Sequence, residues 1–265
     1  MKDVMKIGFT ITLSVLTIVF QGCDSKSPGS SVTAFSHSSS PIVSNPTITT
    51  NPEMYLKEII GNEAAPDLKQ TPEDSVLNQL QWRLSNDKLI SASKESIAWS
   101  TTFGKNSLVV LKVPETTMHW YNFILLSNKD QKWDFYGVID MPITKTLYTD
   151  KQGLALPMES FASAKLTSED SKPKTVWAFG NDSMYAVIGT YPREGFTLPV
   201  GSEELSIAER QSWMIIEKEH SLLFYFDTDY LVWISGKLTR DEIINLTTSL
   251  PSIESSKFPF QNMNS

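Results

Sequence analysis

Cys23 is the only cysteine in the 265-residue chain, and its position defines the chemistry expected of it. It follows Gly22 at the end of an apolar N-terminal stretch, which is where signal peptides are cleaved. Because there is no second cysteine, a disulfide within the chain and a zinc site built from cysteines are both excluded. We therefore expect Cys23 to be a site of modification.

The segment before Cys23 has the features of a signal peptide. Two lysines among the first six residues give it a positive start, and an apolar run covers residues 7–20. This run suits the apolar core of about 7–15 residues found in signal peptides, and it is short of the ~20 residues that span a bilayer. Gly22 supplies the small residue that cleavage requires. Residues 1–22 are therefore predicted to be removed.

The stretch Val19-Phe20-Gln21-Gly22-Cys23 resembles the lipobox of bacterial lipoproteins. It departs at two positions, because lipoboxes usually carry Leu where Phe20 stands and a small residue where Gln21 stands. The resemblance implies that Cys23 is linked to diacylglycerol through a thioether and becomes the new N-terminus. Two acyl chains suffice for stable anchoring to a membrane. A secreted protein with unmodified Cys23 and an uncleaved short anchor are the alternatives.

The rest of the chain holds few residues with the types and spacing of a catalytic site. The histidines His37, His119 and His220 lie in a Ser-rich segment, at a predicted strand start and in a predicted turn, where surface or edge positions are usual. Two Ser-x-x-Lys tetrapeptides, at 85–88 and 91–94, match penicillin-interacting enzymes, but the companion Lys-Thr-Gly is absent. Esterase, zinc-protease, phosphate-loop and dinucleotide signatures are also absent. The sequence thus identifies no catalytic residue, metal site or cofactor.

The seven tryptophans are the other candidates for binding chemistry, since aromatic platforms bind sugars and peptides. Trp120, Trp177 and Trp233 each sit in an apolar, strand-like segment, which favours burial in a core. Trp99 and Trp133 have more polar neighbours. These two are predicted to be exposed and are the candidate ligand-binding residues.

The charge of the chain limits its partners. The 30 acidic residues outnumber the 23 lysines and arginines, which gives a net charge of −7. Nucleic-acid binding calls for clustered lysine and arginine, so a nucleic-acid partner is not expected. No polybasic patch is present to reinforce contact with anionic lipid.

Residues 23–50 follow the signal peptide and are rich in Ser, Pro and Thr. Such a segment cannot bury enough apolar surface to offset its ordering entropy, so we expect a disordered tether. A flexible tether of this length reaches about 30 Å. The tether would hold the folded part clear of the lipid headgroups.

Helical signals precede the first predicted strands. Asn51 and Pro52 are typical of a helix start, and a short helix is expected to run to Gly61. A second helix is predicted over residues 72–85, with Thr71 as its cap. A final helix is predicted from the capping box at 239–242 to Pro251, and short helical pieces near 159–166 and 202–205.

The remaining elements are predicted to be strands. Apolar runs separated by short polar turns occur at 107–113, 120–126, 133–139, 175–179, 184–188, 213–216, 222–226 and 230–234. Connections this short favour antiparallel neighbours, because a parallel crossover needs a dozen or more residues.

These elements predict an α+β fold with antiparallel sheets built from meanders. One helix precedes the first strands and a capped helix ends the chain. The predicted organisation is a signal peptide (1–22), a lipidated linker (23–50) and two lobes, 51–145 and 146–258. A single domain covering 51–258 is the alternative.

The stretch from Tyr230 to Leu250 resembles the ending of extracytoplasmic domains in Gram-positive lipoproteins and anti-sigma-factor-like proteins. In those proteins a strand with an aromatic residue precedes a capped helix that ends in Ser-Leu. The resemblance covers about 25 residues. It implies a sensory, regulatory or binding role at the outer face of the membrane.

The sequence therefore predicts a non-enzymatic lipoprotein on the extracytoplasmic face of the cell membrane. The membrane is contacted through the lipid on Cys23, and the partner is an envelope protein or polymer. A hydrolase of envelope polymer and a solute-binding component of a transporter are the alternatives. His119 or His220 beside a buried carboxylate in a cleft would favour an enzyme.

Overall fold

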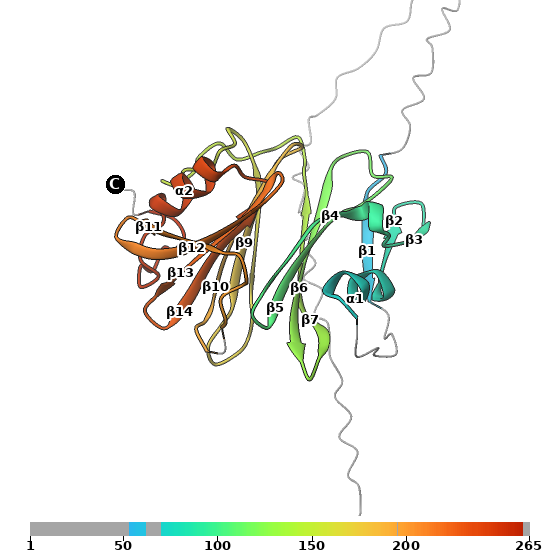
Figure 1. Ribbon diagram of the computed structural model, residues 1–265. Coiled ribbons are helices and arrows are strands. Elements are labelled where there is room, and N and C mark those ends of the chain that lie inside the picture. Colours follow the sequence, from blue (N-terminus) through green and yellow to red (C-terminus); the bar gives the residue numbers. More distant parts are fainter. Residues whose placement is uncertain (1–52, 62–69, 195, 262–265) are drawn as a thin grey trace, which may run out of the picture. The chain divides into compact units, whose positions relative to one another are not determined.

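The computed structural model describes residues 53–61, 70–194 and 196–261 (Figure 1). Contacts divide the chain into two units, Met1–Thr49 and Thr50–Ser265, and every described residue belongs to the second unit. The predicted signal peptide and tether, with Gly22 and Cys23, lie outside the described residues. Their roles remain predictions.

Three antiparallel sheets form the described part of the chain. The first sheet has the order β1-β2-β3, with β1 (Leu56–Gly61), β2 (Leu80–Leu84) and β3 (Leu89–Ser91). The second is a meander of β4 (Ile97–Phe103), β5 (Asn106–Lys112), β6 (Trp120–Lys129) and β7 (Lys132–Pro142).

The third sheet has the order β11-β12-β13-β14-β10-β9-β8. Its strands are β8 (Ala162–Thr167), β9 (Thr175–Gly180), β10 (Tyr185–Pro192), β11 (Glu203–Ile207), β12 (Arg210–Glu217), β13 (His220–Asp227) and β14 (Tyr230–Gly236). The helices of the described residues are α1 (Pro72–Gln79), α2 (Arg240–Ser249) and a 3₁₀ turn at Lys94–Ser96.

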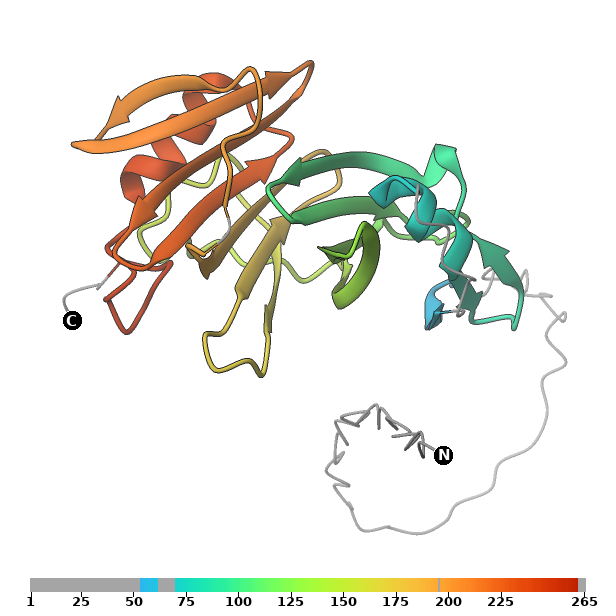
Figure 2. The same cartoon turned by 60° about the horizontal axis from the view of Figure 1, so that its bottom comes forward.

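The sheets pack in layers. One apolar cluster joins the four-stranded sheet to the seven-stranded sheet. A second covers the other face of the seven-stranded sheet with α2 and the C-terminal segment, and a third covers the other face of the four-stranded sheet with α1 and β1–β3. In Figure 2 the red helix α2 lies against the orange strands, and the teal helix α1 lies against the green strands.

Strands β5 and β14 show why the four-stranded and the seven-stranded sheet are each buried on both faces. In β5, Leu108 and Val110 belong to the cluster between the sheets, and the alternating Val109 and Leu111 belong to the outer cluster. In β14, Trp233 lies between the sheets and its neighbours face α2. Continuous apolar runs are expected of strands covered on both faces.

The aromatic core follows the prediction for three of the tryptophans. Trp120, Trp177 and Trp233 are all buried. Trp233 packs directly over Gly189 of the neighbouring strand, where a Cβ atom would lie 2.1 Å from the indole ring. Only a residue without a side chain fits at this position.

The predicted α+β class is wrong. The described chain is mostly antiparallel β-sheet, and its first described element is the strand β1 where a helix ending at Gly61 was predicted. Residues of β1 pair with β2, and this long-range pairing outweighs the local helix signal. The helical pieces predicted near 159–166 and 202–205 are likewise replaced by the edge strands β8 and β11.

The helix predicted over 72–85 is only partly correct. Thr71 caps α1 as predicted, through a reciprocal capping box with Asp74, but the helix ends at Gln79. Leu80 and Leu84 suit a helical spacing of four and also a strand spacing of two. The buried Trp82 between them fits only the strand.

Other local signals are confirmed. The C-terminal helix begins with the capping box of Thr239 and Glu242, and each predicted β-run lies within a strand to within one residue at either end of the run. The β6–β7 turn is tighter than predicted. It consists of Asp130 and Gln131, both with positive φ, as a two-residue hairpin turn of type I′ requires.

The chain enters the described unit beside the β5–β6 loop. Thr117 donates its backbone N–H to the carbonyl of Met54 at 2.8 Å, and Ser85 donates to the carbonyl of Tyr55 at 2.9 Å. The start of the unit is thus held by backbone hydrogen bonds on two sides.

Two tyrosine hydroxyls, those of Tyr185 and Tyr136, offer a test of the central layer. Within the described residues, Tyr185 Oη has no hydrogen-bond partner, whereas Tyr136 Oη and Tyr191 Oη bond to each other. An unsatisfied buried hydroxyl is costly, so Tyr185→Phe should raise the free energy of unfolding by about 1 kcal/mol. Tyr136→Phe leaves Tyr191 unpaired and should lower it by about 1–3 kcal/mol. Urea unfolding measures both, and a destabilised Tyr185→Phe would show that the hydroxyl has a partner.

Candidate functional site

Trp99 and His220 form an aromatic pair that joins two sheets. Trp99 lies on β4, the edge strand of the four-stranded sheet, and His220 opens β13. Their rings stack with centroids 5.0 Å apart and planes 11° apart. The His220 ring also lies 5.9 Å from that of the buried Tyr185, so the pair continues into the central cluster.

This pair lines a hollow of about 280 Å³. Glu73 reaches it from the first turn of α1, Glu217 from the end of β12, and Val200 from the loop before β11. Ser100 Oγ donates a hydrogen bond to the Glu73 carboxylate, which fixes that side chain beside β4. Side chains from α1, β4, β12 and β13 therefore converge on one opening.

The charges that line the hollow are negative. Its lining includes two carboxylates and no lysine or arginine. Neither Glu73 nor Glu217 forms an ion pair within the described ranges. At neutral pH the hollow thus presents uncompensated negative charge next to aromatic rings, an arrangement that attracts cations.

His220 contributes little opposing charge. Its partial burial lowers the pKa of the imidazole below the usual value of 6.5, and Lys237 lowers it further while Glu219 opposes them. The ring is therefore neutral at pH 7.

Trp133 lies elsewhere. It is near the start of β7 and packs against the outer apolar cluster, and its carbonyl accepts a hydrogen bond of 3.0 Å from Ser75 of α1. The structure does not bring Trp99 and Trp133 together. Both side chains are half-buried, so neither stands free on the surface as predicted.

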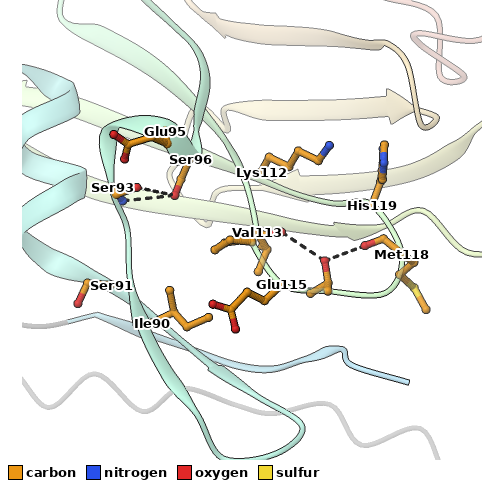
Figure 3. Close-up of a pocket in the computed structure, with 12 residues that line it drawn as sticks. Ile90, Ser91, Ser93, Glu95, Ser96, Lys112, Val113, Glu115, Met118 and His119 are labelled. Atoms are coloured by element: carbon orange, nitrogen blue, oxygen red, sulfur yellow. Dashed lines mark hydrogen bonds between the residues drawn. The ribbon is translucent and has the colours of Figure 1, made fainter. Parts of the chain in front are cut away.

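A second hollow, of about 560 Å³, lies between β3, the 3₁₀ turn and the β5–β6 loop (Figure 3). Ile90, Val113 and Met118 form its apolar part, and Lys112 and His119 lie along one side. The lysine, the histidine and two glutamates give this hollow mixed charge. It shares no lining residue with the Trp99–His220 hollow.

Neither histidine has the surroundings of a general base. His119 Nδ1 lies 2.8 Å from the backbone carbonyl of Asp182 and 3.6 Å from its exposed carboxylate. His220 lines the hollow with Glu73, which is half-buried, and Glu217, which is exposed. In the part of the chain that the structure describes, no buried carboxylate accompanies either histidine in its hollow.

The described residues contain neither a cluster of metal ligands nor a helix suited to a membrane. No group of three or more His, Cys, Asp or Glu side chains is placed to hold a metal ion. None of the helices found there combines the length and apolar character needed to cross a bilayer.

Trp99 and His220 were each considered from the sequence, but separately, and Glu73 and Glu217 were not predicted as site residues. No local signal marks these two glutamates, because each looks like an ordinary surface carboxylate in its own segment. Only the packing of β4 against β12 and β13 brings the four residues together.

The fold and hollow define an antiparallel β-protein with an acidic, aromatic-lined opening at a sheet edge. No protein-family model and no curated protein matches the chain. Among solved structures, the chain is similar to the one described as MucB in complex with MucA(peri). The sequence identity is 11%, over 74% of this chain and 66% of that chain, with a TM-score of 0.23. A likeness this weak assigns no function.

The pKa of His220 predicts a pH dependence of stability. Between the lowered pKa and 6.5, the unfolded chain binds a proton at His220 that the folded chain does not. The free energy of unfolding should therefore fall as the pH is lowered below about 6.5. His220→Phe keeps an aromatic ring and removes the titration, so its stability should fall less. Urea unfolding between about pH 5 and 8 measures this, and identical slopes for both proteins would refute it.

Proposed function

We propose that this chain is a non-enzymatic binding module held at the extracytoplasmic face of the cell membrane by a lipid on Cys23. The cleavable apolar segment, the Gly22–Cys23 pair and the Ser-rich stretch that follows support the anchor. A tether with a reach of about 30 Å lets the folded unit meet partners in the envelope.

The hollow around Trp99 and His220 is the observation that most supports a binding function. It combines aromatic surface with two carboxylates that have no ionic partner in the described residues. Unpaired charge beside half-buried aromatic rings contributes little to folding, and it suits recognition of a ligand. A hydrolase is less well supported, since neither histidine is paired with a buried carboxylate.

The anchor can be tested by replacing the cysteine. Cys23→Ser removes the thiol to which diacylglycerol is attached, so the protein should leave the membrane fraction. Mass spectrometry of the mature N-terminus should show a diacylated Cys23 in the unaltered protein. Ser25→Ala, two residues further on, serves as the control and should stay in the membrane fraction. An unmodified Cys23 on a protein free in the medium would refute the anchor.

The binding site can be tested in intact cells with a photo-crosslinking amino acid, benzoylphenylalanine. Placed at Val200, a fully exposed position in the hollow, it should form a discrete cross-linked product with an envelope component. Tyr148 is 63% exposed and lies outside the hollow, so the same probe there should give none.

Trp99→Ala in the Val200 probe protein should lower the yield of that product severalfold. Equal products at both probe positions, or none at position 200, would contradict the assignment of the site.

A further inference from the structure

Strand β4 is an open sheet edge beside the hollow. It pairs with β5 on one side, and no other described strand pairs with its second side. The opposite edge of the same sheet, β7, contacts β8 of the seven-stranded sheet. In an antiparallel ladder alternate residues direct their backbone N–H and C=O groups away from the paired strand. Half of these groups in β4 therefore face the open side.

The residues of β4 themselves carry few of the features that block further pairing. Natural edge strands usually carry charged residues, proline or bulges that block the addition of another strand. A bulge occurs near Ala98, but the stretch from Trp99 to Phe103 pairs regularly with β5 and has neither charge nor proline. Such an edge can accept an extended peptide, as in known cases of strand addition.

The hollow borders the same stretch. Trp99, Ser100 and Thr101 of β4 are among its lining residues, together with Glu73 and Glu217. A peptide strand beside β4 would thus direct its alternate side chains toward this opening. His220 covers one face of the Trp99 indole, so an arriving side chain meets the rest of that ring and the two carboxylates.

The negative charge of the hollow indicates which kind of peptide side chain it would bind. Both glutamates lack an ion pair in the described residues, and neither lysine nor arginine lines the hollow. An amine or guanidinium would be attracted by the carboxylates and by the aromatic ring. Nearby, Val200 exposes its whole side chain and offers apolar contact to a neighbouring peptide residue.

We infer that the hollow receives a lysine or arginine of an extended segment from a partner protein, and that this segment pairs with the open edge of β4. The inference rests on the proposed binding function and names the class of its ligand. Backbone hydrogen bonds to β4 supply affinity, and the basic side chain between Glu73 and Glu217 supplies specificity.

A random library of 12-residue peptides displayed on phage tests the ligand class. Panning on the purified full chain in detergent should enrich peptides with a lysine or arginine among β-branched residues. The best peptide, labelled with fluorescein, is then titrated by fluorescence polarisation. Enrichment of acidic peptides, or no enrichment, would overturn the inference.

Variants of the protein test the role of charge. Combining Glu73→Gln with Glu217→Gln should weaken binding of the selected peptide about tenfold, because both carboxylates are lost without loss of shape. Glu159→Gln, at an exposed position outside the hollow, should leave the affinity unchanged. Equal affinities of all variants would rule out the acidic hollow as the recognition site.

N-methylation of the peptide tests strand pairing. Methylating alternate amides in one register should abolish binding, and methylating the other register should leave it nearly intact, since only one register bonds to β4. Equal effects in both registers, or binding of spermidine as tight as that of the peptide, would exclude strand addition. If these tests fail while the probe at Val200 still traps an envelope component, the proposed binding function stands and this inference falls.

Discussion

The central constraint on this structure is that strands of both larger sheets are apolar on both faces. In β5 the residues Leu108 and Val110 require cover on one face, and Val109 and Leu111 on the other. Strand β14 is built in the same way. One sandwich interface cannot satisfy such strands, so further layers must be added outside it. Helix α2 and the C-terminal segment form one outer layer, and α1 with β1–β3 forms the other.

The unequal widths of the two sheets explain where the candidate site lies. Seven strands face four, so the wider sheet continues with β12 and β13 at the point where the narrower one ends at β4. Apolar packing alone cannot fill the space between the sheets at this edge, because polar side chains line it beside β4. An aromatic stack between Trp99 and His220 fills part of it, and the remainder is the acidic hollow. The candidate site thus lies at the edge where the seven-stranded sheet extends beyond the four-stranded one.

Sequence patterns predicted those elements whose signals are local. The capping boxes at Thr71 and Thr239 and the long apolar strands were correct, because a few neighbouring residues determine them. The errors occurred where a distant partner decides the structure. Strand β1 needs β2, and Leu80–Leu84 fits two periodicities until Trp82 is packed. The site needs four separate elements in contact, so Trp99 was found by its type and the two glutamates were not.

The backbone bonds that hold the start of the folded unit bear on how it would respond to mechanical load. Any pull from the N-terminal side is first carried by the Met54–Thr117 and Tyr55–Ser85 hydrogen bonds and by the pairing of β1 with β2. If these gave way, Trp82 and the outer face of the four-stranded sheet would lose part of their cover, while the interface between the two larger sheets would remain. Loss of the outermost layer would therefore spare the Trp99–His220 stack but would remove Glu73 of α1 from the candidate site.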